Sequence, residues 1–399
     1  MLFAYQTSSR RSFLVSSLAS AFVIRGDQPN KSPQDKLQWI KTPHEGLQPE
    51  AVIDSKGVVH VVYLYGDPSS ADIAYMRKGP DEREFTSPIR VNSQPGSAVA
   101  LGTVRGAHLA VGKSDRIHVA WNGSSAAEPK GPGSATPMLY TRLTGRGEGF
   151  EPQRNLLTTA VGLDGGGAVA ADARGNVYVT WHSQGQPQGK PIEGEENRRV
   201  WLARSHDDGQ TFETEEPVSP AGLGTCACCG MGAVADSEGN LYLLYRTARE
   251  IVHRDMYLLI SRDRGRTFAA TKVDSWEIGA CPMSTASLVA GNGRVYLAWE
   301  TDKQVYFRVL DSRNGALGKP VQPPGAANGR KHPALAVNER GEILMTWTEG
   351  TGWKKGGSLA WQLFDAAGNP AAANGTSPGL PPWDFAAIAS QKNEFLVIS

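Results

Sequence analysis

The chain has 399 residues, with 41 Lys and Arg against 40 Asp and Glu, and a formal net charge of +1. This balance gives no electrostatic footprint for nucleic acid or an anionic membrane, so neither is an expected partner. The 45 glycines, 25 prolines and 10 tryptophans, set among alternating apolar patterns, predict an all-β protein of many short strands.

The first 25 residues predict an export signal. The pair Arg10-Arg11 precedes a short apolar run and small residues at 19–21, which resembles a twin-arginine signal; an ordinary secretory signal is the alternative. The run is too short to span a bilayer, and no later segment approaches about 18 uninterrupted apolar residues, so no transmembrane segment is expected. We therefore expect a periplasmic or secreted protein, with a linker over 26–36 and one domain over 37–399.

One unit recurs along that domain: an apolar strand, a turn of the D/N-x-x-G type and a second apolar strand. Its seven copies begin at or near residues 49, 107, 167, 232, 286, 333 and 385. Repeats of about 50 residues with four strands each predict a β-propeller. Seven blades are favoured, with six as the alternative. Segment 36–43 would add an outer strand to the last blade and close the ring.

Two turns between these hairpins share the pattern Ser-x-Asp-x-Gly-x-Thr-Phe. They contain Ser205, Asp207, Gly209, Thr211 and Phe212 in one copy, and Ser261, Asp263, Gly265, Thr267 and Phe268 in the other. The Asp and Ser side chains are expected to cap backbone groups of the turn, and the Phe to bury against the next sheet. These turns resemble the Asp-box (BNR) repeats of the sialidase superfamily, where they are structural.

The hairpin topology places the start of each inner strand and the end of each second strand on one face, beside the mouth of the central channel. We call it the mouth face, and propeller ligand sites usually form there. Residues after the second strands include Asn122, His182, Arg246, Glu300 and Glu349, and residues before the inner strands include Asp164, Cys228, Cys229, Cys281, Met283, Arg330 and His332. The candidates for ligand binding are His182, Arg246, Glu300, Arg330 and His332.

All four cysteines are predicted to converge on this face. Three precede the inner strand of the fourth repeat and one precedes that of the fifth, and two methionines accompany them: Cys226, Cys228, Cys229, Cys281, Met231 and Met283. Disulfides fit an exported chain with an even number of cysteines. A soft-metal site for copper or zinc, completed by His182 or His332, is the second interpretation. A free reactive thiol is the third.

The resemblance to sialidases implies a glycoside hydrolase with three arginines for the substrate carboxylate, a Tyr–Glu nucleophile and an Asp acid/base. The positions that match in placement are Arg246 and Arg330, with Arg105 or Arg254 as a third, Asp67 as acid/base and Glu300 as a further catalytic candidate. The sequence departs from the family at residues 44–52, which lack its Arg-Ile-Pro motif, and in having no tyrosine after Tyr306.

Three functions follow, in order of preference. The first is an exported Asp-box propeller that binds a glycan, another small ligand or an exported protein through the mouth face, with the cysteine–methionine cluster as inter-blade disulfide or soft-metal site. The second is a divergent exo-sialidase. The third is a periplasmic scaffold or assembly factor. The charged segment 193–199 is expected to be a solvated insertion.

Overall fold

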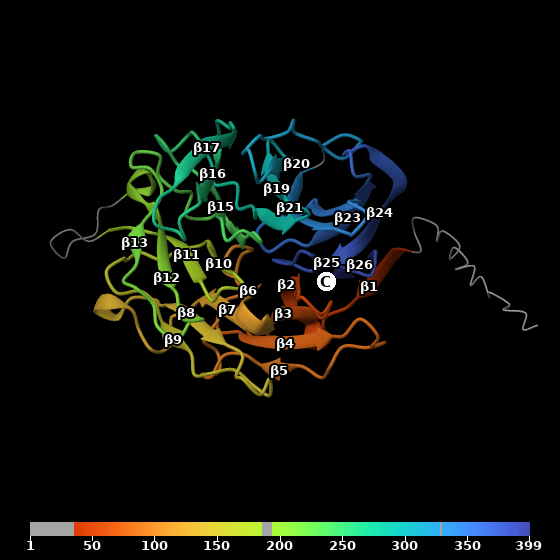
Figure 1. Cartoon of the computed structure of the whole chain (residues 1–399). Helices are drawn as coiled ribbons and strands as arrows, with labels where there is room; N and C mark the ends of the chain where they lie inside the picture. The colour runs from red at the N-terminus through yellow and green to blue at the C-terminus, as the bar shows by residue number, and fades with distance from the viewer. Residues whose placement is uncertain (1–35, 186–193, 328) are drawn as a thin grey trace, which may run out of the picture.

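The computed structural model describes residues 36–185, 194–327 and 329–399. The predicted export signal over 1–25, and the linker up to residue 35, lie outside the described residues. Seven sheets, six of them antiparallel and one mixed, stand around a central channel like the blades of a propeller (Figure 1). The predicted all-β propeller is therefore confirmed, with seven blades and not six. Within the described ranges, no helix is long and apolar enough to cross a membrane.

Each blade runs from an inner strand at the channel to an outer strand at the rim. Blades one to three contain β2 (Leu47–Ile53), β3 (Val59–Tyr65), β4 (Asp72–Lys78) and β5 (Ile89–Arg90); β6 (His108–Val111), β7 (Ile117–Asn122), β8 (Met138–Arg142) and β9 (Arg154–Asn155); and β10 (Gly167–Ala171), β11 (Val177–Ser183), β12 (Arg199–Ser205) and β13 (Glu216–Pro217). Blades four to six contain β14 (Gly232–Ala235), β15 (Leu241–Arg246), β16 (Met256–Ser261) and β17 (Ala269–Asp274); β18 (Ser287–Gly291), β19 (Arg294–Thr301) and β20 (Gln304–Asp311); and β21 (Arg330–Val337), β22 (Ile343–Glu349), β23 (Gly357–Phe364) and β24 (Pro370–Leu380). Short 3₁₀ turns lie at Pro43–Glu45, Lys113–Asp115, Pro132–Ser134 and Glu195–Asn197.

Blade seven closes the ring with both ends of the described chain. It contains β25 (Ala387–Gln391), β26 (Glu394–Ile398) and β1 (Leu37–Ile40), and β1 pairs in parallel with β26. The Thr42 N–H also donates to the Ser399 carbonyl at 2.9 Å. The predicted closing strand within 36–43 is confirmed. Blades five and seven have three strands and the others four.

Aspartate carboxylates stabilise the turns of the inner hairpins in blades three and four. Asp172 Oδ1 accepts the N–H groups of Arg174 and Asn176, each at 2.9 Å, and Asp236 repeats this arrangement in blade four. Gly175 has a φ of 91°, which a residue with a Cβ adopts only with strain. The Asp and the Gly of the repeated motif therefore form the turn itself and are not available for chemistry.

The Asp-box turns use the same principle on the face opposite the cysteines. Asp207 Oδ1 accepts the Thr211 N–H at 2.9 Å, and Ser205 Oγ accepts the Gly209 N–H at 2.9 Å; the second copy has equivalent bonds. The Phe212 ring packs edge-on against Tyr140 with 4.8 Å between centroids. That contact is with the preceding blade, so each Asp box helps to join two blades.

The core consists of apolar clusters between adjacent blades. A large aromatic side chain near the end of each second strand of blades one to six is at most 4% exposed: Tyr63, Trp121, Trp181, Tyr245, Trp299 and Trp347. Burial of such side chains stabilises the fold by about 2 to 3 kcal/mol each. These aromatics belong to the buried apolar clusters, and the polar residues that follow them in the sequence lie at the mouth face.

Candidate functional site

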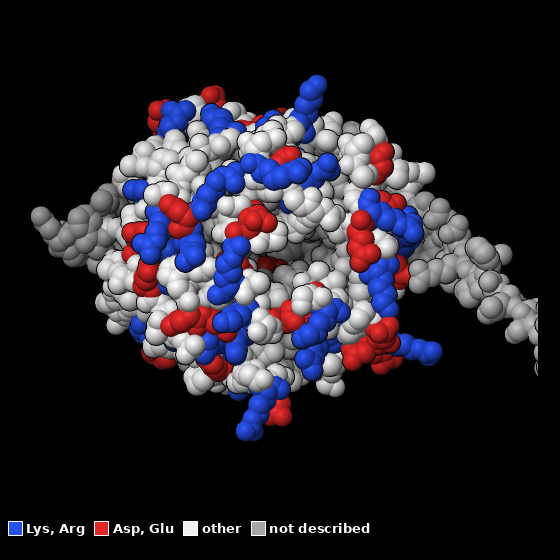
Figure 2. Space-filling view, in the orientation of Figure 1, with Lys and Arg blue, Asp and Glu red and all other residues white. Residues whose placement is uncertain are grey.

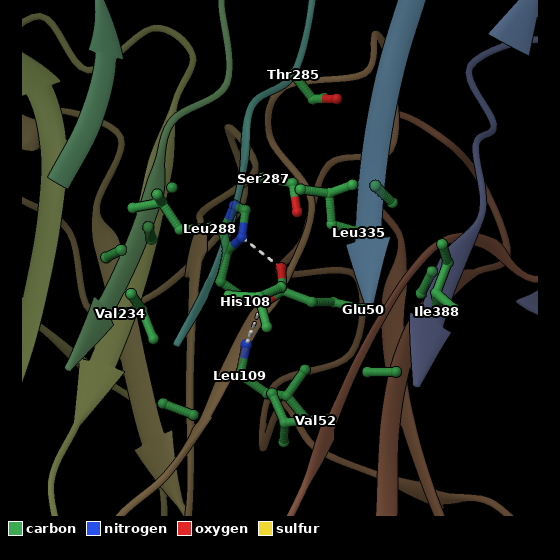
Figure 3. Close-up of a pocket in the computed structure, with 18 of the residues that line it drawn as sticks. Glu50, Val52, His108, Leu109, Val234, Thr285, Ser287, Leu288, Leu335 and Ile388 are labelled. Carbon is green, nitrogen blue, oxygen red and sulfur yellow. Dashed lines mark hydrogen bonds and ion pairs between the residues drawn. The ribbon is translucent and has the colours of Figure 1, made fainter. Parts of the chain in front are cut away.

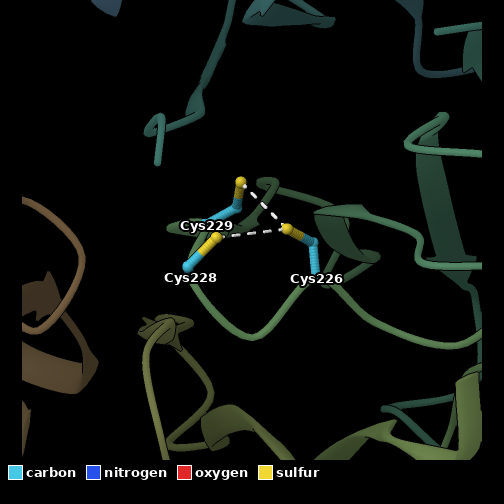
Figure 4. A group of neighbouring side chains, drawn as sticks. All are labelled: Cys226, Cys228 and Cys229. Atoms are coloured by element: carbon cyan, nitrogen blue, oxygen red, sulfur yellow. Dashed lines mark hydrogen bonds between the residues drawn. The ribbon is translucent and has the colours of Figure 1, made fainter. Parts of the chain in front are cut away.

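The turn that carries the first three cysteines is held by backbone hydrogen bonds at the mouth face of blade four (Figure 4). The Cys226 N–H donates to the Arg246 carbonyl at 2.9 Å, and the Cys229 N–H donates to the Cys226 carbonyl at 3.2 Å. The Gly230 N–H donates to the Ser284 carbonyl of the loop that begins blade five, at 2.9 Å. This last bond brings the two cysteine-bearing loops together.

The four sulfur atoms converge as the sequence predicts. A disulfide joins Cys228 to Cys281, with 6.4 Å between their Cα atoms, and so links blade four to blade five. Cys226 and Cys229 are free and buried. The Cys226 Sγ lies 3.5 Å from that of Cys228 and 3.4 Å from that of Cys229 (Figure 4). The sequence left the pairing of the cysteines open, and the structure contains the Cys228–Cys281 disulfide.

The sulfur atoms also form a potential metal-ligand set. The Sγ atoms of Cys226, Cys228 and Cys229 all lie within 4.8 Å of one another, and a Glu195 carboxylate oxygen lies within the same distance of the Cys226 and Cys281 sulfurs. Thiolates bound to zinc at about 2.3 Å in a tetrahedron are about 3.8 Å apart, close to the separations observed here. Small side-chain movements would therefore bring these sulfurs to a common ion.

Glu195 was not predicted to belong to the site. It comes from the insertion between β11 and β12, and its Oε1 accepts the Ala227 N–H at 3.3 Å. Its Oε2 accepts a hydrogen bond from Arg254 Nη2 at 2.7 Å. The expectation that 193–199 is merely a solvated insertion is wrong for Glu195. A charged segment gives no signal in the sequence that one of its carboxylates turns inward.

The thiols of the free pair have different proton affinities. The hydrogen bond that Cys226 donates to Cys229, together with burial, raises the pKa of the Cys226 thiol. Burial alone would raise the pKa of Cys229, but the Cys226 hydrogen bond and the charge of Arg246 outweigh it and lower this pKa to about 7. Cys229 is thus the thiol that ionises first, with its negative charge balanced by nearby cations.

Several buried polar atoms around the cysteines have no hydrogen-bond partner among the described residues. They include Arg254 Nε and Nη1, Glu300 Oε2 and Thr225 Oγ1. Buried polar groups in folded proteins almost always have a partner. Burial also raises the pKa of the Glu300 carboxyl. This concentration of polar groups is typical of a ligand site and not of a hydrophobic core.

The two predicted histidines lie apart from the sulfur atoms. Both His182 nitrogens are buried and have no hydrogen-bond partner in the described part of the chain. A Cβ at Gly166 would lie 2.6 Å from His182 Nδ1 and 2.8 Å from the Cys229 carbonyl. Burial lowers the pKa of His182 to about 3 and the pKa of His332 to about 3. The His332 ring stacks on Phe385, in the loop that precedes the inner strand of blade seven. Within the described residues, neither histidine belongs to a group of converging metal-ligand atoms.

The two methionines also differ in their surroundings. Met231 is 2% exposed and packs in the apolar cluster between blades three and four. Met283 is half-buried with a φ of 51° in the loop that carries Cys281. Met231 therefore packs in the core between blades three and four. Met283 follows the disulfide residue Cys281 by two positions in the sequence.

Arg246 lies where the sequence predicts, but its donors are already used. Nη1 donates to the Arg254 carbonyl at 2.7 Å, Nη2 donates to the Glu300 carbonyl, and the guanidinium covers the Trp276 ring at 5.1 Å. With 2% exposure, this side chain joins blades four and five beneath the cysteine cluster. It acts on the thiols through its charge.

Arg330 is similarly occupied in blade six. Its Nε pairs with Glu349 at 3.0 Å, and its terminal nitrogens donate to Gln304 and to the carbonyls of Pro323 and Pro324 at 2.8 to 3.2 Å. The side chain is 7% exposed. The arrangement leaves no fork of donors directed at a substrate carboxylate.

The remaining candidates of the hydrolase interpretation are also held in local structure. Arg105 forms an ion pair of 2.6 Å with the Asp164 carboxylate. The backbone carbonyl of Asp164 accepts a hydrogen bond from the Asn122 side chain. Asp67 is exposed and accepts two hydrogen bonds from Ser69, which lower the pKa of its carboxyl. Asp67 therefore forms a loop turn, and the structure does not bring these groups together with Arg246 or Arg330 into one pocket.

The channel itself is a cavity of about 400 Å³ lined by the inner strands of all seven blades. A hollow is visible at the centre of the space-filling view (Figure 2). Small and aliphatic side chains dominate the wall, but Glu50 Oε2 pairs with His108 Nδ1 at 2.6 Å, and Glu50 Oε1 accepts the Leu109 N–H (Figure 3). Ser287, from the inner strand of blade five, also lines the channel (Figure 3). The sequence did not indicate this acid–base pair, since the two residues are 58 positions apart.

Comparison with known protein families found no matching family, and no curated protein matches the chain. Solved structures do match. A protein of unknown function from Dyadobacter fermentans has a TM-score of 0.54 at 14% identity, covering 86% of this chain and 97% of its own. The Hadza microbial sialidase Hz136 has a TM-score of 0.50 at 14% identity, covering 83% and 71%. The leech intramolecular trans-sialidase has a TM-score of 0.49 at 9% identity, covering 90% and 87%. Identities this low show the fold alone. The chain has a sialidase-like β-propeller fold.

Proposed function

We propose that this protein is an exported propeller whose mouth face binds a soft metal ion, copper(I) or zinc, between blades four and five. One observation carries the proposal: three cysteine sulfurs lie within 4.8 Å of one another, with Glu195 and the Cys281 sulfur alongside. Export is inferred from the arginine pair and apolar run within residues 1–25.

The donor set fits such an ion. Thiolates prefer copper(I) and zinc, and an ion held by three of them keeps a position for an exchangeable ligand. Binding requires that the Cys228–Cys281 disulfide is reduced, so that Cys228 contributes a thiolate and Cys281 is available as a fourth ligand. When bound, the ion would supply Lewis acidity or, for copper, electron transfer.

The surrounding residues support a negatively charged cluster. The charge of Arg254 acts on both buried thiols, and the charge of Arg246 acts on Cys229. Each charge favours the ionised form of the thiols on which it acts. Arg254 is held by Glu195, which also fixes the cysteine turn through the Ala227 N–H. The protein thus orients the sulfurs and offsets their charge, whichever of the two ions is bound.

The test is metal content per chain in mature protein purified without chelator, under reducing and non-reducing conditions. We expect near-stoichiometric copper or zinc in the reduced protein and its loss in Cys228→Ser. Met283→Leu is the matched control, because it changes the same rim without removing a thiolate. If the reduced wild-type chain holds no metal after incubation with either ion, the proposal is wrong and the cluster is a disulfide site.

A divergent glycoside hydrolase receives less support. The arginines that would hold a sialic acid carboxylate donate instead to backbone carbonyls and to Glu349. A role as a scaffold for an exported partner rests on the fold alone.

A further inference from the structure

One oxidised and one reduced cysteine pair share the space between blades four and five. The Cys226 thiol is in contact with two sulfurs: that of Cys228, which is bonded to Cys281, and that of Cys229 (Figure 4). Thiol–disulfide exchange requires attack of a thiolate on a disulfide sulfur. The Cys226 sulfur lies 3.5 Å from the Cys228 sulfur, close enough for such an attack.

The two pairs differ in their access to solvent. Cys226 is 0% and Cys229 is 1% exposed, whereas Cys281 is exposed and Cys228 is half-buried. A molecule in solution can therefore reach the disulfide but not the free thiols. Electrons held by the buried pair have one route to the surface, through the Cys228 sulfur.

We propose that the four cysteines form a thiol–disulfide relay in which the buried Cys226/Cys229 pair reduces the Cys228–Cys281 disulfide, which then reduces an accessible disulfide of another molecule. This activity goes beyond metal binding and does not depend on it. The substrate class is a disulfide-containing exported protein or small disulfide.

The internal step is balanced. Cys226 passes its proton to the Cys229 thiolate, to which it is hydrogen-bonded, and attacks Cys228 Sγ; the Cys228–Cys281 bond breaks, and Cys281 leaves as a thiolate. Cys229 then attacks Cys226 Sγ, and Cys228 leaves as a thiolate. The protons lost by Cys226 and Cys229 are taken up by Cys281 and Cys228. One disulfide and two thiols are present before and after, so no external oxidant or reductant is used.

The external step transfers two electrons. Cys281 attacks the substrate disulfide and releases one substrate thiolate, and Cys228 then attacks Cys281 in the mixed disulfide and releases the second. The chain ends with two disulfides, Cys226–Cys229 and Cys228–Cys281. The substrate gains two electrons and two protons and becomes a dithiol.

Arg254 supports the relay independently of the sulfur distances. Its side chain is 3% exposed, and Nε and Nη1 have no hydrogen-bond partner among the described residues, although Nη2 pairs with Glu195. Its charge acts on both Cys226 and Cys229. A guanidinium with unused donors stabilises the thiolates that form and leave during exchange.

The test uses mature protein treated with chelator, so that its outcome is separate from that of metal binding. The chain is denatured in the presence of N-ethylmaleimide, so that buried free thiols are also trapped, and is then digested with trypsin, which yields peptides 205–246 and 273–294. In the described state these peptides are joined and carry two labels on 205–246. After internal exchange they separate, with one label on each. The total of two labels distinguishes exchange from reduction or oxidation by the solvent.

We expect wild-type protein to contain both forms and to reduce one equivalent of oxidised glutathione per chain. Cys226→Ser should keep the peptides joined and slow glutathione reduction by at least about tenfold, because the buried electrons cannot reach the surface. Cys229→Ser should separate the peptides but leave a Cys226–Cys228 bond. Wild-type peptides that stay joined over hours at pH 8, or unchanged glutathione reduction in Cys226→Ser, would overturn the relay. Metal binding by such a chain would leave the proposed function intact.

Discussion

Glu195, from an insertion in blade three, forms an ion pair of 2.7 Å with Arg254 in blade four. Arg254 is 3% exposed and Glu195 28%, so the pair lies at the border of the interior beside the cysteine turn. The same carboxylate accepts the Ala227 N–H. A single side chain thereby connects two blades, orients the charge beside the thiols and supports the turn that carries three of them.

Replacement of Glu195 by Gln should lower the free energy of unfolding by about 2 kcal/mol, because it leaves the buried Arg254 guanidinium without a counter-charge. Since Glu195 is partly exposed, this loss is smaller than the loss expected for a fully buried ion pair. Urea denaturation measures the effect. Glu250→Gln is the control, since Glu250 forms an ion pair with Arg249 in which it is 67% exposed, and a change of at most about 0.5 kcal/mol is expected there. Equal losses in the two variants would contradict the structural role of Glu195.

Gly166→Ala should disturb the site from within. Its φ is 68°, and an added Cβ would lie 2.6 Å from His182 Nδ1 and 2.8 Å from the Cys229 carbonyl. We expect a loss of about 3 kcal/mol in unfolding free energy, together with weaker metal binding, because both strain and overlap act there. Gly222→Ala separates the two effects: the φ of Gly222 is 79°, but no atom of the residues that the structure describes lies within 4 Å of the new Cβ, so only about 1 kcal/mol of strain is expected. Similar values for both variants would exclude the close contact with His182.

Asp384 predicts a pH-dependent stability. It is 2% exposed, and burial raises the pKa of its carboxyl to about 7, despite the hydrogen bond that it accepts from the Gln48 N–H at 2.7 Å. Because the folded pKa exceeds the unfolded value of about 4, the folded state binds more protons between these values and loses stability as the pH rises. Relative to Asp384→Asn, wild-type protein should lose about 2 kcal/mol between pH 5 and pH 8.

Thermal unfolding of the two proteins across this pH range measures the difference. Asn retains an acceptor for the Gln48 N–H, so the comparison isolates the charge. A difference between the two melting temperatures that is independent of pH would show that Asp384 is ionised or neutral throughout.

The arginines predict the absence of sialidase activity. Arg246 donates to two backbone carbonyls, and Arg330 to Glu349, Gln304 and two further carbonyls, so neither presents a free fork to a carboxylate. A fluorogenic sialoside should therefore not be cleaved above background by wild-type protein. Arg330→Lys should instead lower stability by about 2 to 3 kcal/mol, since an ammonium cannot replace the planar set of bonds. Sialoside cleavage that disappears in Arg246→Ala would restore the hydrolase interpretation.

The sequence by itself determined the repeat and the convergence of the four cysteines. Seven alternating hairpins, most of them with Asp or Asn and Gly in the turn, specify seven blades locally, because strand alternation and turn chemistry depend on neighbouring residues. The closing strand and the convergence of the cysteines follow from topology, since strands of known direction place their ends on one face.

Only the tertiary structure decided what those residues contact. Cys281 could pair with any of three cysteines by spacing, and the choice of Cys228 depends on how the blade-four turn is held by Ser284 and Arg246. The direction of Glu195 and the bond from Arg246 to the Glu300 carbonyl depend in the same way on partners more than 50 positions away. Long flexible side chains take their direction from the packing of adjacent blades, which no local pattern encodes.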